Sequence, residues 1–250
     1  MKKILLTAIN AKYIHSNLAV YSLKAYAQSC FDVPVEIAEY TINQQTDDIL
    51  RDIYKRKPDM ICFSCYIWNI NYVEELIPEV AKVLPNAEIW VGGPEVSYDS
   101  RKVLERLTEV TGVMKGEGEK TFAELCKYYQ EPELENLKNI AGITFRTESN
   151  EIIDNPWRMP MNLSEVPFVY DNMKDFENKI IYYETSRGCP FSCSYCLSSI
   201  DKKVRLRSLD LVKKELQFFI DHKVPQVKFV DRTFNCKHDH AMAIWEFIRD

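Results

Sequence analysis

An alternation of short apolar runs with helical patterns, from Lys2 to about Gln130, constrains the fold more than any other feature. Between the runs, apolar residues fall three and four positions apart, as on one face of a helix. The runs of strand length lie at residues 4–8, 35–39, 60–64, 89–91 and 113–115. Repeated β-α units of this kind predict an α/β fold in which a parallel sheet has helices on both faces.

The number of predicted strands makes this sheet flavodoxin-like, a doubly wound five-stranded parallel sheet. Its ligand crevice should lie beyond the carboxyl ends of the strands. Gly92-Gly93 follows the fourth run and Gly116-Glu117-Gly118 follows the fifth, so both loops should lie at this edge. Glycine lets bare backbone approach a ligand closely. Taken alone, the loops fit a flavin or nucleotide site, or no ligand at all.

Composition limits the class of protein. With 46% hydrophobic residues and seven glycines in 250 residues, the chain is neither disordered nor of low complexity. The 37 acidic and 32 basic residues give a net charge of -5, so a nucleic-acid partner is not expected. Because we find no apolar run of eighteen residues and no export signal, we expect a soluble cytoplasmic protein without a membrane partner.

The pattern changes after Pro132. Residues 142–146 and 151–154 predict a hairpin that extends the sheet or closes the domain, and the proline-containing stretch 155–178 predicts a linker. Two further β-α units follow from residue 180. We therefore expect a first domain at residues 1–135, a hairpin and linker at 136–178, and an incomplete (β/α) barrel at 179–250.

Three cysteines on one loop carry the strongest chemical signal. Cys189, Cys193 and Cys196 have the spacing C-x3-C-x2-C directly after a predicted strand. Eight cysteines without an export signal do not predict disulfides. Three thiolates on a short loop can each bind one iron of a four-iron cluster and leave the fourth iron open. The alternative is a zinc site, whose fourth ligand would come from Cys236, His238 or His240.

This loop, with Glu184-Thr185-Ser186-Arg187-Gly188 before it and the segment 229–235 after it, resembles that of the radical S-adenosylmethionine enzymes. A doubly wound domain ahead of it resembles the B12-binding domain of the cobalamin-dependent members. The resemblance implies a 4Fe-4S cluster on the three cysteines, S-adenosyl-L-methionine on the open iron beside Tyr195, and cobalamin in the first domain. It also implies an external electron donor such as flavodoxin or ferredoxin. The residues that it places around cobalamin are Ser64, Tyr66, Trp68, Asn69, Gly92, Gly93, Pro94, Glu95, Gly116, Glu117, Gly118 and Glu119.

One departure concerns the lower cobalt ligand. The D-x-H-x-x-G motif of many cobalamin folds is absent, and the loop from Asn10 to Asn17 has only His15. We expect a corrinoid without histidine ligation from the protein. The family's barrel has five or six β-α units, so the resemblance also predicts a truncated chain that is inactive alone.

The resemblance implies reductive cleavage of S-adenosylmethionine and methyl transfer to an unactivated carbon of an unknown small molecule, without naming a catalytic side chain. Two alternatives stay open: a non-catalytic corrinoid or nucleotide module, and a tRNA-modifying methylthiotransferase with cluster cysteines of its own in the first domain. Cys62 and Cys65 are expected to be core thiols on opposite faces of a strand. The basic residues of the segment after the loop, which predict a solvated face or an anion contact, are Lys202, Lys203, Arg205 and Arg207.

Overall fold

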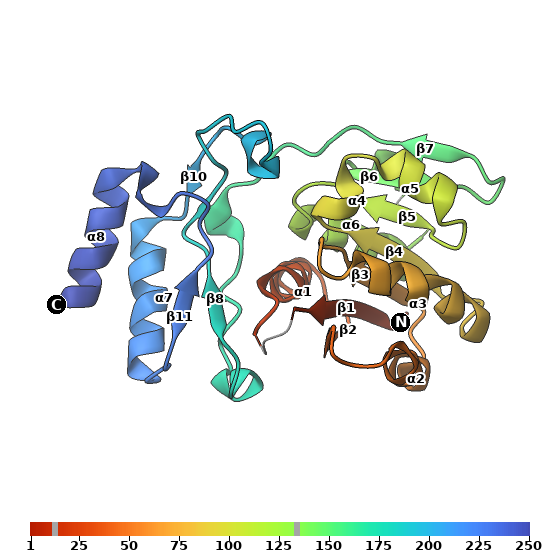
Figure 1. The fold of residues 1–250 in the computed structure, drawn as a ribbon, viewed down its shortest axis with the longest axis horizontal. Helices are drawn as coiled ribbons and strands as arrows, with labels where there is room; N and C mark the ends of the chain where they lie inside the picture. Colours follow the sequence, from red (N-terminus) through yellow and green to blue (C-terminus); the bar gives the residue numbers. More distant parts are fainter. Residues whose placement is uncertain (12–14, 133–135) are drawn as a thin grey trace. The chain divides into compact units, whose positions relative to one another are not determined.

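A computed structural model describes residues 1–11, 15–132 and 136–250 (Figure 1). The chain divides into two compact units, Met1–Pro160 and Met161–Asp250. Residues 12–14 of the loop before His15, and the predicted domain boundary at 135, lie outside the described residues. No helix in the described ranges is long and apolar enough to cross a bilayer.

Unit one contains a seven-stranded sheet with the strand order β2-β1-β3-β4-β5-β6-β7. The five predicted strands are present and parallel, and the predicted hairpin adds β6 and β7 as antiparallel strands. Lys115 lies just beyond the fifth strand, which ends one residue earlier than predicted. The strands are β1 Ile4–Asn10, β2 Val35–Thr41, β3 Met60–Ser64, β4 Glu88–Gly92, β5 Gly112–Met114, β6 Ile143–Arg146 and β7 Ile152–Asp154.

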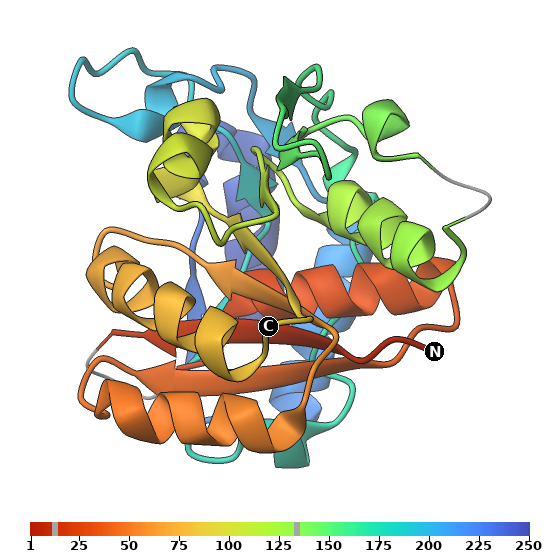
Figure 2. The same ribbon diagram turned by 90° about the vertical axis from the view of Figure 1, so that its right-hand side faces the viewer.

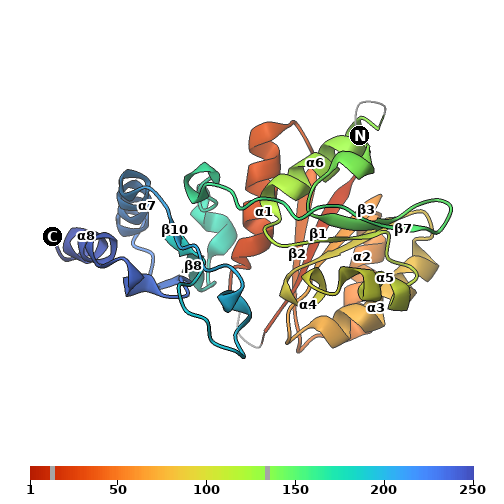
Figure 3. The same ribbon diagram turned by 90° about the horizontal axis from the view of Figure 1, so that it is seen from above.

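Helices cover both faces of this sheet, as Figures 2 and 3 show. Every residue of β1 is buried, as is typical of a parallel strand covered on both sides. One face packs Leu6, Trp90 and Phe122 together, and the other packs Leu5 and Phe63. The helices are α1 Leu18–Cys30, α2 Thr46–Arg56, α3 Ile70–Val83, α4 Pro94–Ser97, α5 Ser100–Arg106 and α6 Glu119–Gln130, with a 3-10 turn η1 at Leu137–Asn139.

The free thiols of unit one agree with the expected core role. Cys62 packs on one face of the sheet and Cys65 on the other, which confirms that they are core thiols on opposite faces. Burial raises the pKa of the Cys65 thiol to about 12 and raises the pKa of Cys62 and Cys126 as well. Cys30, in contrast, is exposed at the end of α1. Buried, protonated thiols are poor cluster ligands, which disfavours a second cluster in this unit.

Unit two contains two β-α units around an aromatic core. Strand β8 pairs in parallel with β11, and β9 pairs antiparallel with β10. Phe219 is buried, with its ring 5.4 Å from that of Tyr170 and 5.7 Å from that of Tyr183. The elements are β8 Ile181–Tyr183, β9 Ser186–Arg187, β10 Arg205–Leu206, α7 Leu209–Asp221, β11 Val227–Phe229 and α8 His238–Arg249, with 3-10 turns η2 Leu163–Glu165, η3 Met173–Phe176, η4 Leu197–Ser199 and η5 Phe234–Cys236.

Candidate functional site

The carboxyl ends of four parallel strands lie in register at one edge of the sheet. Ala8 of β1 is opposite Ser64 of β3, Ser64 is opposite Gly92 of β4, and Gly92 is opposite Met114 of β5. The strand order changes direction at β1, because β2 lies on one side of it and β3 on the other. Ligands of doubly wound sheets bind beyond the carboxyl ends at such a switch point. The three predicted loops therefore start from the edge where a ligand is expected.

The loop after β3 is shaped by Asn69. Its fully buried amide accepts a hydrogen bond from the Tyr66 amide at 2.8 Å and donates to the carbonyls of Ser64 and Ile9 at 2.8 and 2.9 Å. These bonds join Asn69 to the loop itself and to strand β1, so its side chain holds the loop's shape. Trp68 stacks on Tyr66 with ring centroids 4.4 Å apart and remains 40% exposed. The loop thus presents a flat aromatic surface from a rigid base.

A buried serine that the sequence analysis did not single out joins the two glycine loops. The Ser97 hydroxyl donates to the Gly93 carbonyl at 2.8 Å and accepts from the Gly116 amide at 3.2 Å. Gly93 has a φ of 112°, and a Cβ there would lie 2.4 Å from the Cys65 carbonyl oxygen. Only glycine meets both conditions at this position. A serine in a short helix gave no sign in the sequence that it would reach the next loop.

The hairpin fixes the start of the loop after β5. Lys115 is 2% exposed, and its ammonium pairs with Asp154 and donates to the Asn155 carbonyl at 2.8 Å. The Trp157 ring covers it, with a centroid 5.2 Å away. Burial alone would raise the pKa of Asp154, but hydrogen bonds from Lys115 and Thr144 outweigh it and lower that pKa. Antiparallel strands β6 and β7 therefore position this loop as well as widening the sheet.

The remaining predicted residues of this edge differ in exposure. Pro94 begins α4 and Glu95 is exposed beside it. Glu119 begins α6 and is buried, and a Cβ on Gly118 would lie 2.8 Å from a methyl group of Leu23. The two glycine loops therefore start side by side at this edge of the sheet, while Glu95 faces solvent.

The cysteine loop is held at its start by the segment that follows it. The Cys189 amide donates to the Asp201 carbonyl at 3.0 Å. Gly188 has a φ of 97°, and a Cβ there would lie 2.4 Å from the Lys203 carbonyl oxygen. The Thr233 hydroxyl lies 3.4 Å from the Cys189 sulfur, and this hydrogen bond is the main influence that lowers the pKa of the thiol. A thiol with a lowered pKa is a better metal ligand.

The three thiols suit an iron-sulfur cluster by chemistry. All three are free; Cys193 and Cys196 are exposed and Cys189 is half-buried, while Tyr195 between them is 92% exposed. Within residues 1–11, 15–132 and 136–250, no three cysteine, histidine or acidic side chains converge in a metal-binding arrangement. This holds for the three loop thiols and for Cys236, His238 and His240 alike. Three thiols in eight residues are the donor set that a cluster with one open iron uses.

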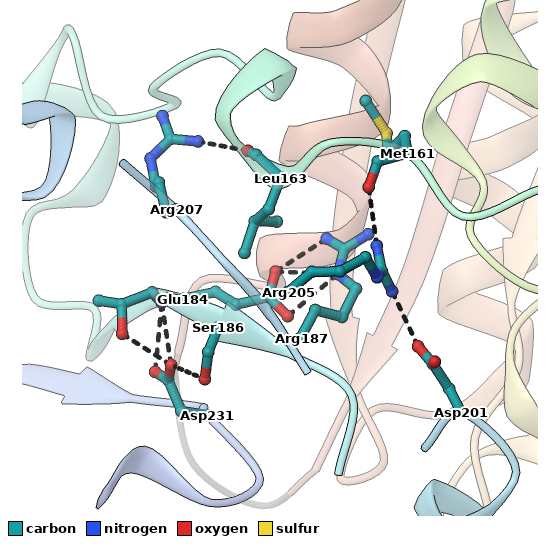
Figure 4. A network of polar contacts seen from close by, with 10 residues as sticks. Met161, Leu163, Glu184, Ser186, Arg187, Asp201, Arg205, Arg207 and Asp231 are labelled. Atoms are coloured by element: carbon teal, nitrogen blue, oxygen red, sulfur yellow. Dashed lines mark hydrogen bonds and ion pairs between the residues drawn. The ribbon is translucent and has the colours of Figure 1, made fainter. Parts of the chain in front are cut away.

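A polar network ties this loop to the end of β11 (Figure 4). Asp231 accepts hydrogen bonds from the Thr185 hydroxyl at 2.7 Å and the Ser186 hydroxyl at 2.5 Å, and from the Thr185 amide. Arg187 forms a bidentate ion pair with Glu184 at its side. The sequence analysis singled out residues 184–188 and 229–235, but local patterns could not show that Asp231 joins the two segments.

The basic segment after the loop is split by the fold. Arg205 pairs with Asp201 at 2.8 Å, and Arg207 is buried and pairs with Glu215. The expectation of a solvated face or an anion contact is therefore wrong for Arg207, because Glu215 neutralises it inside unit two. Two of the residues offered for a zinc site, His238 and His240, lie in the first turn of α8, whose N-cap residue is Lys237.

Comparisons with known proteins show what the chain is similar to. The B12 binding domain family matches residues 4–126. An uncharacterized methyltransferase of Pyrococcus horikoshii is 28% identical over 207 residues, which is 79% of this chain. The cobalamin-dependent radical SAM methyltransferase TokK of Streptomyces tokunonensis is 26% identical over 192 residues, or 71% of this chain. Residues 4–126 thus match a B12-binding domain, and the chain as a whole is similar to cobalamin-dependent radical S-adenosylmethionine proteins.

The likeness to a solved structure extends over the whole of this chain. The structure of the cobalamin-dependent S-adenosylmethionine radical enzyme OxsB, with aqua-cobalamin and S-adenosylmethionine bound, superimposes with a TM-score of 0.80 at 21% identity. That match covers 100% of this chain and 37% of OxsB, and it shows a shared fold. The chain spans 44% of the Pyrococcus relative and 28% of TokK.

Proposed function

We propose that this chain acts in cobalamin-dependent radical S-adenosylmethionine chemistry, with methyl transfer to an unactivated carbon of a small molecule as the reaction. One observation carries the proposal: the B12-binding domain at residues 4–126 shares a chain with the C-x3-C-x2-C loop at 189–196. Two matched relatives are named methyltransferases, which favours methyl transfer over other radical reactions. The substrate class beyond a small molecule stays open.

In this proposal residues 1–135 hold cobalamin, residues 136–178 form the hairpin and linker, and residues 179–250 hold the cluster and S-adenosylmethionine. The glycine loops let backbone approach the corrinoid, and the Tyr66–Trp68 pair offers it a flat surface. His15 is left out as a cobalt ligand. When bound, the cluster supplies the electron that cleaves S-adenosylmethionine, and cobalamin carries the methyl group.

The thiols of Cys189, Cys193 and Cys196 would hold the cluster, with Tyr195 beside S-adenosylmethionine. Thr233 and Asp231 act on this loop indirectly, the first by its hydrogen bond to Cys189 and the second by fixing Thr185 and Ser186. Thiolate ligands need a reducing compartment, so we place the protein in the cytoplasm with an external one-electron donor.

The test is anaerobic cluster reconstitution followed by titration with hydroxocobalamin. Wild type should take up about four irons per chain, and a Cys189→Ala/Cys193→Ala/Cys196→Ala variant should take up none. A Cys30→Ala/Cys236→Ala variant, which removes two accessible thiols outside the loop, should load like wild type. Equal iron in all three proteins contradicts the cluster. A corrinoid spectral shift without iron uptake would instead support the non-catalytic corrinoid module.

A further inference from the structure

The hairpin of unit one brings the chain back to the edge of the sheet where the glycine loops start. Strand β7 runs in the same direction as β5, because β6 pairs antiparallel with both. Asp154, the last residue of β7, is opposite Thr144 of β6, and Thr144 is opposite Val113, one residue before the end of β5. Residues 155–158 therefore continue past the carboxyl end of the sheet, beside the loop after β5.

This segment is fixed on both sides of Trp157, although the sequence predicted the start of a linker here. The buried Asn155 side chain donates a hydrogen bond to the Ile140 carbonyl at 2.7 Å. Arg158 donates to the Glu124 carboxylate at 3.0 Å. Because residues before and after Trp157 are anchored on unit one, the position of its ring is set in advance.

The Trp157 ring forms an aromatic pair with Tyr98, the residue directly after α4. The two ring centroids are 5.4 Å apart, with the planes tilted by 32°. The Trp157 ring also lies over the Lys115 ammonium and borders the next residue, because a Cβ on Gly116 would lie 3.4 Å from it. Trp157 is 48% exposed and Tyr98 is 46% exposed. The pair therefore borders the loop after β5 and keeps about half of its surface open.

A second flat surface at this edge suits a ligand with two flat parts. The Tyr66–Trp68 pair follows β3, and two strand spacings, roughly 10 Å, separate β3 from β5. A single small ring cannot lie against both pairs. A corrinoid has a flat macrocycle and, at the end of its nucleotide tail, a flat heteroaromatic base.

We propose that Trp157 and Tyr98 stack against the base of the corrinoid's nucleotide and make this chain selective for complete corrinoids. This inference rests on the proposed function, in which the Tyr66–Trp68 pair faces the macrocycle. Stacking on an aromatic side chain suits any such base, since every base has a flat π face. Rings that are already fixed lose little conformational freedom when the ligand binds.

The test compares two ligands on the full chain. Hydroxocobalamin carries the nucleotide tail, whereas aquocobinamide has the same macrocycle without the nucleotide. Trp157→Ala should weaken the binding of hydroxocobalamin about tenfold and leave aquocobinamide at wild-type affinity, both measured by titration of the corrinoid absorption. Trp157→Phe keeps a flat ring and should recover most of the affinity for hydroxocobalamin.

Tyr98→Ala is a second variant, which leaves the Trp157 ring on Lys115 and decides the matter if Trp157→Ala does not fold. It should weaken the binding of hydroxocobalamin about threefold and leave aquocobinamide unaffected. Tyr54→Ala is the matched control, because Tyr54 lies on α2 and is 49% exposed. The control variant should bind both ligands like wild type.

The two ligands separate the possible failures. Equal losses for hydroxocobalamin and aquocobinamide in the Trp157 and Tyr98 variants would overturn the inference, because the rings would then contact the macrocycle. Wild-type affinity of both variants for hydroxocobalamin would also overturn it and would leave the proposed function intact. If wild type binds neither corrinoid, the proposed function itself fails, and the inference fails with it.

Discussion

The sheet edge of unit one is fixed by more hydrogen bonds than the cysteine loop of unit two. At the sheet edge, buried side chains such as Asn69, Ser97 and Lys115 fix the loops through hydrogen bonds. The cysteine loop is tied at its start through Cys189, while Cys193 and Cys196 remain exposed. Packing therefore preforms the edge, whereas the three thiols do not converge in the described part of the chain, and we expect bound metal to bring them together.

Among the substitutions that test this comparison, Gly93→Ala should cause the largest loss of stability. The alanine would need a φ of 112° and would place its Cβ 2.4 Å from the Cys65 carbonyl oxygen. We expect a loss of about 3 kcal/mol in the free energy of unfolding, measured by urea denaturation. Gly92→Ala is the matched control, because its Cβ would meet Met114 at 3.4 Å, an ordinary contact. Equal losses in the two variants would show that this loop is not preformed.

Asp231→Asn should weaken the ties of the cysteine loop. Asparagine keeps the shape of the side chain but loses the charge that Thr185 and Ser186 bind. Hydrogen bonds to charged groups contribute about 1.5–3 kcal/mol, so unit two should lose about 2 kcal/mol of stability. Urea unfolding followed by tryptophan fluorescence measures this loss, and Asp221→Asn, at an exposed position on α7, serves as the control. An unchanged midpoint would mean that Asp231 does not tie the loop.

Ser97→Ala should disturb the edge without unfolding it. The change removes the hydroxyl that joins Gly93 to Gly116. One lost hydrogen bond of about 1 kcal/mol corresponds to roughly a fivefold weaker affinity for hydroxocobalamin. Ser100→Ala is the matched control, because its equally buried hydroxyl bonds to Thr144 and touches neither glycine loop. Equal affinities of the two variants for hydroxocobalamin would show that the Ser97 hydroxyl does not support binding at the edge.

The smallest effect is a pH dependence at the base of the loop after β5. The pKa of Asp154 is lower in the folded chain, because the bonds from Lys115 and Thr144 outweigh the effect of burial. Its contribution is therefore present above the unfolded pKa of about 4 and is lost as pH falls through the folded value. Asp154→Asn should be less stable than wild type at neutral pH, and the difference should shrink in acid. A difference that grows in acid, measured by urea unfolding across this range, would contradict the pair.

The sequence predicted elements better than it predicted contacts. Apolar runs located all five parallel strands, and the period of the helices located α1, α3 and α6. The sequence analysis placed Lys115 at the end of a strand, because no neighbouring residue shows that its buried ammonium group pairs with Asp154. Arg207 read as a surface charge for the same reason, since its partner Glu215 lies on α7. Pairings between distant residues follow from the topology, which local patterns do not contain.

The most direct test of a preformed edge and a metal-dependent loop is anaerobic hydrogen exchange of the metal-free chain, before and after each cofactor is added. The account predicts that residues 64–69, 92–95 and 115–119 are already protected and gain protection only with hydroxocobalamin. Residues 190–199 should exchange rapidly and become protected only after iron-sulfur reconstitution. Rapid exchange of the edge loops without cobalamin, or a cysteine loop protected without metal, would contradict it.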